Sequence, residues 1–422
     1  MSSQAAPRIG YRQALASRQF RALLASQLVS VSGTSIAAVA LTILVYQRTA
    51  SPLLASLTFA LGFLPYLLGG GLLSSVIDRV RPRRLVASCD LVSALLAATM
   101  AWPAIPVTIL LVLLLAIGTL ASVSSGARVA LARSAVAEGA YVPARSLMRI
   151  AAQVAQIGGN AGGGALLVVL TPSGALLVNA ASFAFSAAAV RFALADRANA
   201  GQPSQARLLR DSLRGARTIL AHAELRRLLL VGWLAPMFAV APEALAAPYV
   251  AAHHGSSTLV GWWLVALPVG LIGGDIAGVR LLTPQQQRRL VAPAAAAGFV
   301  PYLAFAFEPP IPIALLLLVV SGACGLYMLG LDARVRDAVP PQLFARAMTL
   351  NSAGLMTLQG VGFTLAGAIA QGVGPAIAIA IAGSLGLTAT TALLRSDLRP
   401  LRLRIDRPTQ RRKLRRANAR TG

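Results

Sequence analysis

The chain consists mainly of long apolar runs separated by short polar segments. A helix needs about 20 apolar residues to cross a hydrocarbon core of roughly 30 Å, and most of these runs reach that length. The pattern therefore predicts an all-α membrane protein with twelve transmembrane helices. The predicted spans lie near residues 22–46, 53–77, 83–103, 105–126, 146–170, 174–194, 227–251, 258–280, 289–307, 311–333, 347–371 and 376–394.

Composition and charge support this class. Hydrophobic residues make up 56% of the chain and charged residues only 12%, whereas soluble domains carry about 25% charged residues. The net charge of +25 would suggest a nucleic-acid partner in a soluble protein. Here, however, every Lys and Arg except Arg48 falls in alternate connections between the predicted spans, as the positive-inside rule requires of cytoplasmic loops. We therefore expect lipid rather than nucleic acid as the partner, and both termini in the cytoplasm.

The spans fall into two groups of six that resemble each other. Leu64-Pro65 followed by Gly70-Gly71 recurs as Leu267-Pro268 followed by Gly273-Gly274, and Gly118 has a counterpart in Gly322. A duplicated six-helix unit suits alternating access around a central cavity. The expected domains are a six-helix bundle at 1–194, a cytoplasmic linker with an amphipathic helix at 195–226, a second bundle at 227–394 and a basic cytoplasmic tail at 395–422. The linker also fits a plain solvated segment.

The connection after the second span carries a charged motif made of Asp78, Arg79, Arg83 and Arg84. It resembles the Gly-x-x-x-Asp-Arg-x-Gly-Arg-Arg signature of the major facilitator superfamily, although Ser74 replaces the first glycine and Arg81-Pro82 interrupt the end. The resemblance implies a 6+6 secondary transporter in which these residues latch the cytoplasmic helix ends. We expect Arg128 to pair with Asp78 and Asp275 to belong to a degenerate second copy. The alternative is that the arginines only set topology.

Two further segments resemble exporters of that superfamily. Gly159-Asn160-Ala161-Gly162-Gly163-Gly164 is similar to the Gly-Pro-x-x-Gly-Gly element of the drug:proton antiporters, with Asn160 in place of proline. The segment 179–183, together with Asp90, resembles the branch that includes macrolide and siderophore exporters. These resemblances imply export and a helix-packing hinge at Gly159, Asn160, Gly163 and Gly164. Glycine patches also serve ordinary helix packing.

Asp90, Glu243 and Asp275 are the acids within apolar runs. A charge at the centre of a membrane helix costs roughly 2.5–3.5 kcal/mol, so such an acid must be neutralised, paired or hydrated. Glu243 lies deepest, and three prolines around it (Pro236, Pro242, Pro248) predict a broken helix of the kind that lines cavities. We expect Glu243 to couple proton flow to transport. Asp90 is a second candidate, although its position six residues after Arg84 favours a structural pairing with the arginines of the preceding connection. For Glu243 the alternative is a hydrogen bond to a neighbouring helix.

Uncharged polar residues inside the spans are expected to line the cavity or to join helices. They are Gln153, Gln156, Asn160, Asn179, Asn351 and Gln359. Trp233 is expected to join them in the cavity lining by stacking on a substrate. Cys89 and Cys324 both lie in apolar runs and predict neither a disulfide nor a metal site. We find no Gly-x-x-x-x-Gly-Lys-Ser/Thr loop for ATP and no Ser/His/Asp arrangement, so the sequence predicts neither an enzyme nor a cofactor.

Together these patterns predict a secondary active transporter of the bacterial inner membrane. It would export a small amphipathic compound in exchange for protons and would function as a monomer. A metabolite importer or facilitator of the same fold is the nearest alternative. A membrane receptor or scaffold that transports nothing is the alternative from another class.

Overall fold

The computed structural model describes residues 11–63, 65, 80–137, 140–195, 219–339 and 344–398, and these ranges contain helices and no strands. Asp78 and Arg79, most of the 195–226 linker and most of the basic tail lie outside the described residues. Before residue 195 the helices are α1 (Tyr11–Ala16), α2 (Arg18–Thr49), α3 (Pro52–Phe63), α6 (Pro82–Met100), α7 (Val107–Ala135), α8 (Tyr141–Leu166) and α9 (Pro172–Ala193). We call residues 11–195 the N-terminal half.

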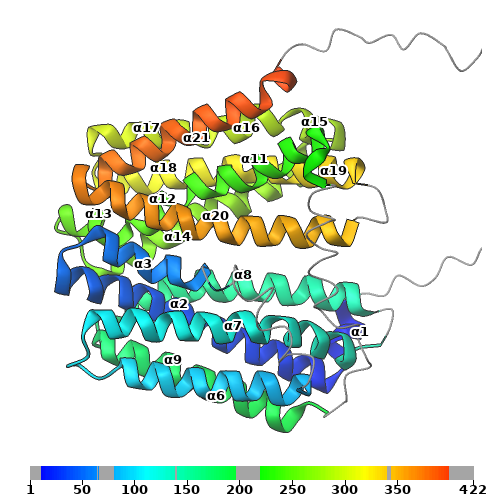
Figure 1. Cartoon of the computed structure of the whole chain (residues 1–422), viewed down its shortest axis with the longest axis vertical. Coiled ribbons are helices and arrows are strands. Elements are labelled where there is room, and N and C mark those ends of the chain that lie inside the picture. Colours follow the sequence, from blue (N-terminus) through cyan, green and yellow to red (C-terminus); the bar gives the residue numbers. More distant parts are fainter. Residues whose placement is uncertain are drawn as a thin grey trace, which may run out of the picture.

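The remaining helices form the C-terminal half, residues 219–398. They are α11 (Ala223–Ala239), α12 (Ala241–Ala244), α13 (Ala246–Ala252), α14 (Ser257–Leu281), α15 (Pro284–Arg289), α16 (Val291–Ala297), α17 (Val300–Leu303), the 3-10 turn η2 (Ala304–Phe307), α18 (Ile311–Ala323), the 3-10 turn η3 (Cys324–Leu326), α19 (Tyr327–Ala338), α20 (Phe344–Val373) and α21 (Pro375–Leu398). In Figure 1 the N-terminal half occupies the lower part of the view and the C-terminal half the upper part.

Within the described residues, eight helical segments are long and apolar enough to cross a membrane. Two shorter apolar segments, Pro52–Phe63 and Val291–Phe307, accompany them. The multi-pass membrane class is therefore confirmed, whereas twelve crossings remain a prediction. The eight segments are Arg18–Thr49, Val107–Ala135, Pro172–Ala193, Ala223–Ala244, Ser257–Leu281, Ile311–Ala338, Leu350–Val373 and Pro375–Arg395.

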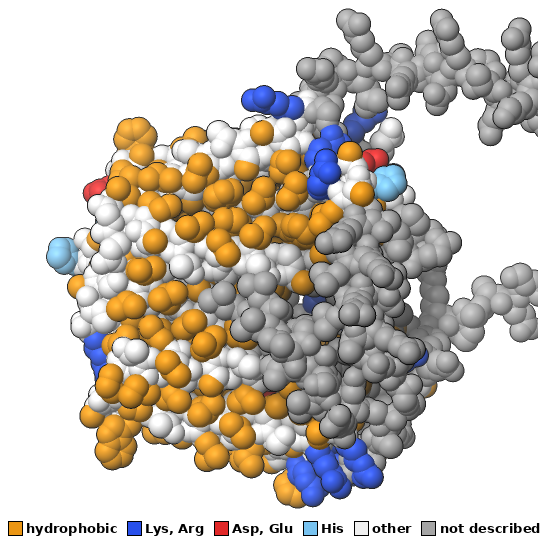
Figure 2. Space-filling view, viewed as in Figure 1, with side chains coloured by type: hydrophobic (Ala, Val, Ile, Leu, Met, Phe, Trp, Pro, Cys, Tyr) orange, Lys and Arg blue, Asp and Glu red, His pale blue; other side chains and the backbone are white. Residues whose placement is uncertain are grey.

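The surface matches a chain surrounded by lipid. Large apolar side chains such as Val112, Val279 and Leu316 are exposed on the surface of their helices. Figure 2 shows apolar side chains spread over the flanks of both halves, with Arg side chains concentrated towards the end that carries α15. Large exposed apolar patches are rare on soluble monomers. These flanks therefore indicate contact with lipid rather than with water.

The predicted repeat has a counterpart in the packing of the two halves. A Cβ atom added to Gly118 of α7 would lie 2.8 Å from the Leu61 carbonyl of α3, and one added to Gly322 of α18 would overlap the Leu267 carbonyl of α14. The two glycines therefore allow the same kind of close approach between the second and fourth predicted spans of each half.

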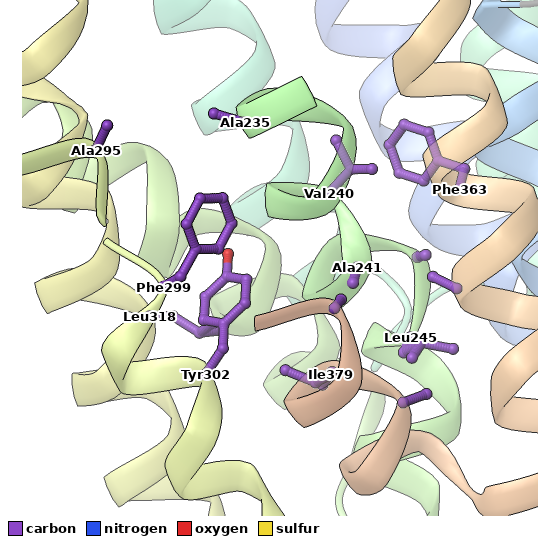
Figure 3. Close-up of a cluster of buried hydrophobic side chains, with 14 of the residues drawn as sticks. Ala235, Val240, Ala241, Leu245, Ala295, Phe299, Tyr302, Leu318, Phe363 and Ile379 are labelled. Carbon is purple, nitrogen blue, oxygen red and sulfur yellow. The ribbon is translucent and has the colours of Figure 1, made fainter. Parts of the chain in front are cut away.

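The C-terminal half has the richer aromatic core. Phe299 and Tyr302 lie on one side of the segment formed by α11 and α12, and Phe363 of α20 lies on the other (Figure 3). Tyr302, Phe305 and Phe363 are fully buried. These rings pack around the point where the α11–α13 segment is broken, which is also where the cavity described next is found.

Candidate functional site

A cavity of about 220 Å³ lies mainly within the C-terminal half and is closed on one side by α8 of the N-terminal half. Small residues such as Ala235, Ala239, Gly298 and Gly322 leave the space that it occupies. The predicted central cavity is therefore displaced towards the C-terminal half. Its polar and aromatic lining residues include Gln156, Asn160, Glu243, Trp263, Phe299, Ser321, Tyr327 and Gln359.

Glu243 reaches this cavity from the four-residue helix α12, at the centre of the broken segment. Breaks occur at Val240 and Leu245, consistent with the prolines that the sequence places there, because proline has no backbone N–H to donate. Glu243 is half-buried, and no hydrogen bond or ion pair of its carboxylate is found among the described residues. An acid in this position is available for a proton or a ligand.

Two aromatic side chains hold the broken segment in place. The Tyr302 hydroxyl donates to the Ala239 carbonyl at 2.9 Å, and Trp263 Nε1 donates to the Pro242 carbonyl at 2.8 Å. Backbone carbonyls at a helix break need such donors when they are buried away from water. The bonds therefore fix the residue on each side of the first break, and with it the place of Glu243.

The predicted glycine patch packs α8 against two helices. A Cβ atom added to Gly159 would lie 2.7 Å from the Ser32 carbonyl of α2, and one added to Gly164 would lie 2.8 Å from Gly261 Cα of α14. The patch thus faces its own half through Gly159 and the other half through Gly164. Between them, Asn160 is buried and lines the cavity.

A second junction joins α20 to the stretch 51–63 of the N-terminal half. Ser51 Oγ donates to Gln371 Oε1 at 2.8 Å, and a Cβ atom on Gly367 would overlap the Ser56 side chain. Phe363 stacks on Phe59 and Phe63, with ring centroids 5.3 and 5.4 Å apart. Gln359, Phe363, Gly367 and Gln371 are spaced four residues apart, so one face of α20 runs from the cavity along this junction.

Asp90 lies outside this cavity and is paired within the N-terminal half. Arg128 Nη2 donates to both of its carboxylate oxygens, at 2.6 and 2.8 Å, and Ser186 Oγ donates at 2.6 Å. Asp90 is only 4% exposed, so the ion pair joins α6, α7 and α9 in the interior. The residue that we expected to pair with Asp78 thus binds a different acid in this structure. We missed this partner because Arg128 and Asp90 are far apart in sequence.

The other predicted latch residues lie near the Arg-rich end. Arg83 donates to the Leu194 carbonyl at 3.0 Å, and Arg84 is exposed. Asp275 of α14 is half-buried and lies within electrostatic range of Asp332 of α19. The described residues thus place Asp275 beside another acid in its own half.

Of the predicted lining residues, Gln156, Asn160 and Gln359 reach this cavity and four do not. Trp233 Nε1 donates to the carbonyl and side chain of Asn351 at 3.1 Å, which joins α11 to α20. Asn179 is buried against α2, where Ser182 Oγ donates to its carbonyl at 2.7 Å. Gln153 is exposed. Buried polar side chains find hydrogen-bond partners within the protein as well as at cavities, and sequence alone does not separate the two uses.

The apolar flank, the two helical halves and the cavity beside α8 define a multi-pass helical membrane protein of the transporter class. A family model described as transmembrane secretion effector matches residues 11–413. The chain therefore belongs to this family of major facilitator superfamily transporters. No curated protein sequence matches the chain.

Solved structures share the fold at low sequence identity. A bacterial homologue of the human lysosomal transporter Spinster, in an inward-facing and unoccupied conformation, is 14% identical with a TM-score of 0.65, and the match covers 93% of this chain and 96% of that one. The POT family transporter PepTSo is 11% identical with a TM-score of 0.68, covering 90% and 98%. A D-xylose-proton symporter is 13% identical with a TM-score of 0.64, covering 90% and 97%.

Proposed function

We propose that this protein exports a small amphipathic compound in exchange for protons, by alternating access, across the bacterial inner membrane. The observation that carries the proposal is Glu243, an acid without a described partner, in a largely apolar cavity at a broken helix. A carboxyl that loses contact with water favours its protonated form and ionises again when water returns. Glu243 can therefore bind a proton on one side of the membrane and release it on the other.

The contacts between the halves support the alternating movement. Under the positive-inside assignment, Gly164, Gly261, Gly367 and Gln371 lie towards the outer ends of their helices. The α8–α14 and α3–α20 contacts then close the outer side, which corresponds to an inward-facing state. The Spinster homologue was solved in an inward-facing conformation, and the family description names secretion.

Asp90 is the weaker candidate for proton coupling. Its carboxylate accepts three hydrogen bonds, two of them from an arginine. Both carboxylate oxygens are therefore already engaged in joining α6, α7 and α9. We therefore assign proton coupling to Glu243 and a structural role to the Asp90–Arg128 pair.

The experiment begins with a growth-inhibition panel on a strain that lacks the gene, which identifies a cargo. Accumulation of that cargo is then measured in cells that express the wild type, Glu243→Gln or Glu308→Gln, with the proton gradient intact and collapsed. Glu308 is an exposed acid outside the cavity and serves as the matched control. We expect collapse of the gradient to raise accumulation at least tenfold in the wild type and in Glu308→Gln, and Glu243→Gln to accumulate cargo in both conditions.

Two outcomes would contradict the proposal. Wild-type accumulation that falls when the gradient collapses indicates proton-driven import. Efflux by Glu243→Gln that keeps its wild-type rate and pH dependence removes Glu243 from the coupling step.

A further inference from the structure

The charges around the cavity have one sign. Among the described residues that line it, Glu243 is the only acid, and there is no Arg, Lys or His. An ionised carboxylate in such a place attracts a cation more strongly than it would in water, because the low dielectric of the surroundings screens it less. An anionic ligand would meet the carboxylate without any opposing charge in this lining.

The aromatic lining residues favour a cation with an apolar body. Trp263, Phe299 and Tyr327 contribute to the wall. The indole N–H of Trp263 is already donated to the Pro242 carbonyl, one residue before Glu243. Trp263 is only 1% exposed and its ring packs on Tyr249, with ring centroids 4.6 Å apart. It can therefore offer a ligand an apolar edge but no hydrogen bond. A carboxylate beside an aromatic wall is the chemistry that recognises ammonium groups.

The opposite wall adds neutral polar groups. Gln156 and Asn160 come from α8, and Gln359 comes from α20. Their amides can donate to or accept from a polar substituent without adding charge. The ligand site is thus asymmetric, because the acid and the aromatic rings belong to the C-terminal half, whereas two of the three amides belong to α8.

The size of the cavity sets an upper limit on the ligand in this conformation. Drug-sized ligands occupy pockets of roughly 300–1,000 Å³, whereas this cavity holds about 220 Å³. It is therefore suited to a compact molecule and is too small for a macrocycle unless the halves move apart.

We infer that the cavity binds a compact monovalent organic cation, an ammonium group carried on an aromatic or aliphatic body, with Glu243 as the counter-ion. The inference rests on the proposed function in that this cavity is taken as the transport site. A proton and the cation then compete for the same carboxylate, so that protonation of Glu243 releases the ligand.

The test measures binding to the purified full-length protein, with no membrane gradient. The probes are benzyltrimethylammonium, neutral benzyl alcohol and anionic benzoate, and the readouts are tryptophan fluorescence and thermal shift at pH 8 and at pH 5.5. We expect the wild type to bind the cation at least tenfold more tightly than either other probe at pH 8, and to lose most of that preference at pH 5.5. Glu243→Gln should lose the preference at both pH values, whereas Glu308→Gln keeps the wild-type pattern.

Three results would overturn the inference. They are equal binding of the three probes by the wild type, no binding of the cation at millimolar concentration, and a cation preference that persists in Glu243→Gln. If that variant does not fold, the wild-type selectivity and its loss at low pH still decide the matter. Binding without coupled efflux would contradict the proposed function alone, and coupled efflux of a neutral compound would contradict only the cation site.

Discussion

The contacts within each half differ in kind from the contacts between the halves. Inside the N-terminal half, Asp90, Arg128 and Ser186 form a buried ion pair with three charge-assisted hydrogen bonds. Between the halves, the described contacts at these junctions are neutral: Gly164 packs on Gly261, Gly367 packs on Ser56, and Ser51 donates a hydrogen bond to Gln371. Charge-assisted bonds are roughly twice as strong as neutral ones.

This difference teaches how the molecule could move. Breaking a buried ion pair leaves an unpaired charge away from water, whereas separating two glycines exposes little surface and leaves no charge behind. The N-terminal half is therefore held together by charge, whereas the described contacts at the α8–α14 and α3–α20 junctions can separate without leaving a charge unpaired. Alternating access requires this combination.

The largest effect is expected from Arg128→Ala, which removes one partner of the ion pair inside the N-terminal half. The loss of a partner leaves the Asp90 carboxylate buried and uncompensated, which typically lowers the free energy of unfolding by about 3–5 kcal/mol. We expect a clear fall in the melting temperature of the purified protein in detergent. Arg133→Ala, an exposed arginine on the same helix α7, is the matched control and should melt like the wild type. Equal melting of the two variants would show that the pair does not hold the half together.

A smaller effect is expected at the glycine junction between the halves. In Gly164→Ala the added Cβ atom would lie 2.8 Å from Gly261 Cα, and overpacking of this kind costs typically 1–3 kcal/mol. The two halves can relieve this overpacking by moving apart at the α8–α14 junction. We therefore expect the variant to populate a conformation that is more open on the outer side. Gly162→Ala is the control, since a Cβ atom there has no neighbour within 4 Å.

The measurement uses a reporter cysteine at Ser56, which is fully buried against α20, in a chain without Cys89 and Cys324. A membrane-impermeant thiol reagent should label it several-fold faster in Gly164→Ala than in Gly162→Ala. Equal labelling rates, together with a lower melting temperature in Gly164→Ala, would mean that this junction belongs to the rigid part of the molecule.

The sequence predicted those features that depend on local pattern. Apolar run lengths predicted the eight long apolar helical segments found among the described residues, and the prolines around Glu243 predicted the broken segment. The Gly118 and Gly322 counterparts predicted a repeat whose packing is seen in both halves. Pairings between distant helices were beyond reach, because nothing in the local pattern links Asp90 to Arg128 or Trp233 to Asn351. For the same reason, Gln156 could not be distinguished from Gln153 as a lining residue before their helix was placed.

The smallest effect is expected from Gln371→Ala, which we compare with Ser186→Ala inside the N-terminal half. Ser186→Ala removes a hydrogen bond to a charged group within the N-terminal half, which contributes about 1.5–3 kcal/mol. Gln371→Ala removes a neutral hydrogen bond between the halves, which contributes about 0.5–1.5 kcal/mol. We expect Ser186→Ala to lower the melting temperature without changing the labelling of the Ser56 reporter. Gln371→Ala should instead raise labelling two- to tenfold and leave the melting temperature nearly unchanged, because 1.4 kcal/mol corresponds to a factor of ten in an equilibrium. If both variants shift the same readout, contacts within and between the halves stabilise one cooperative unit, and the rigid-body movement loses its physical basis.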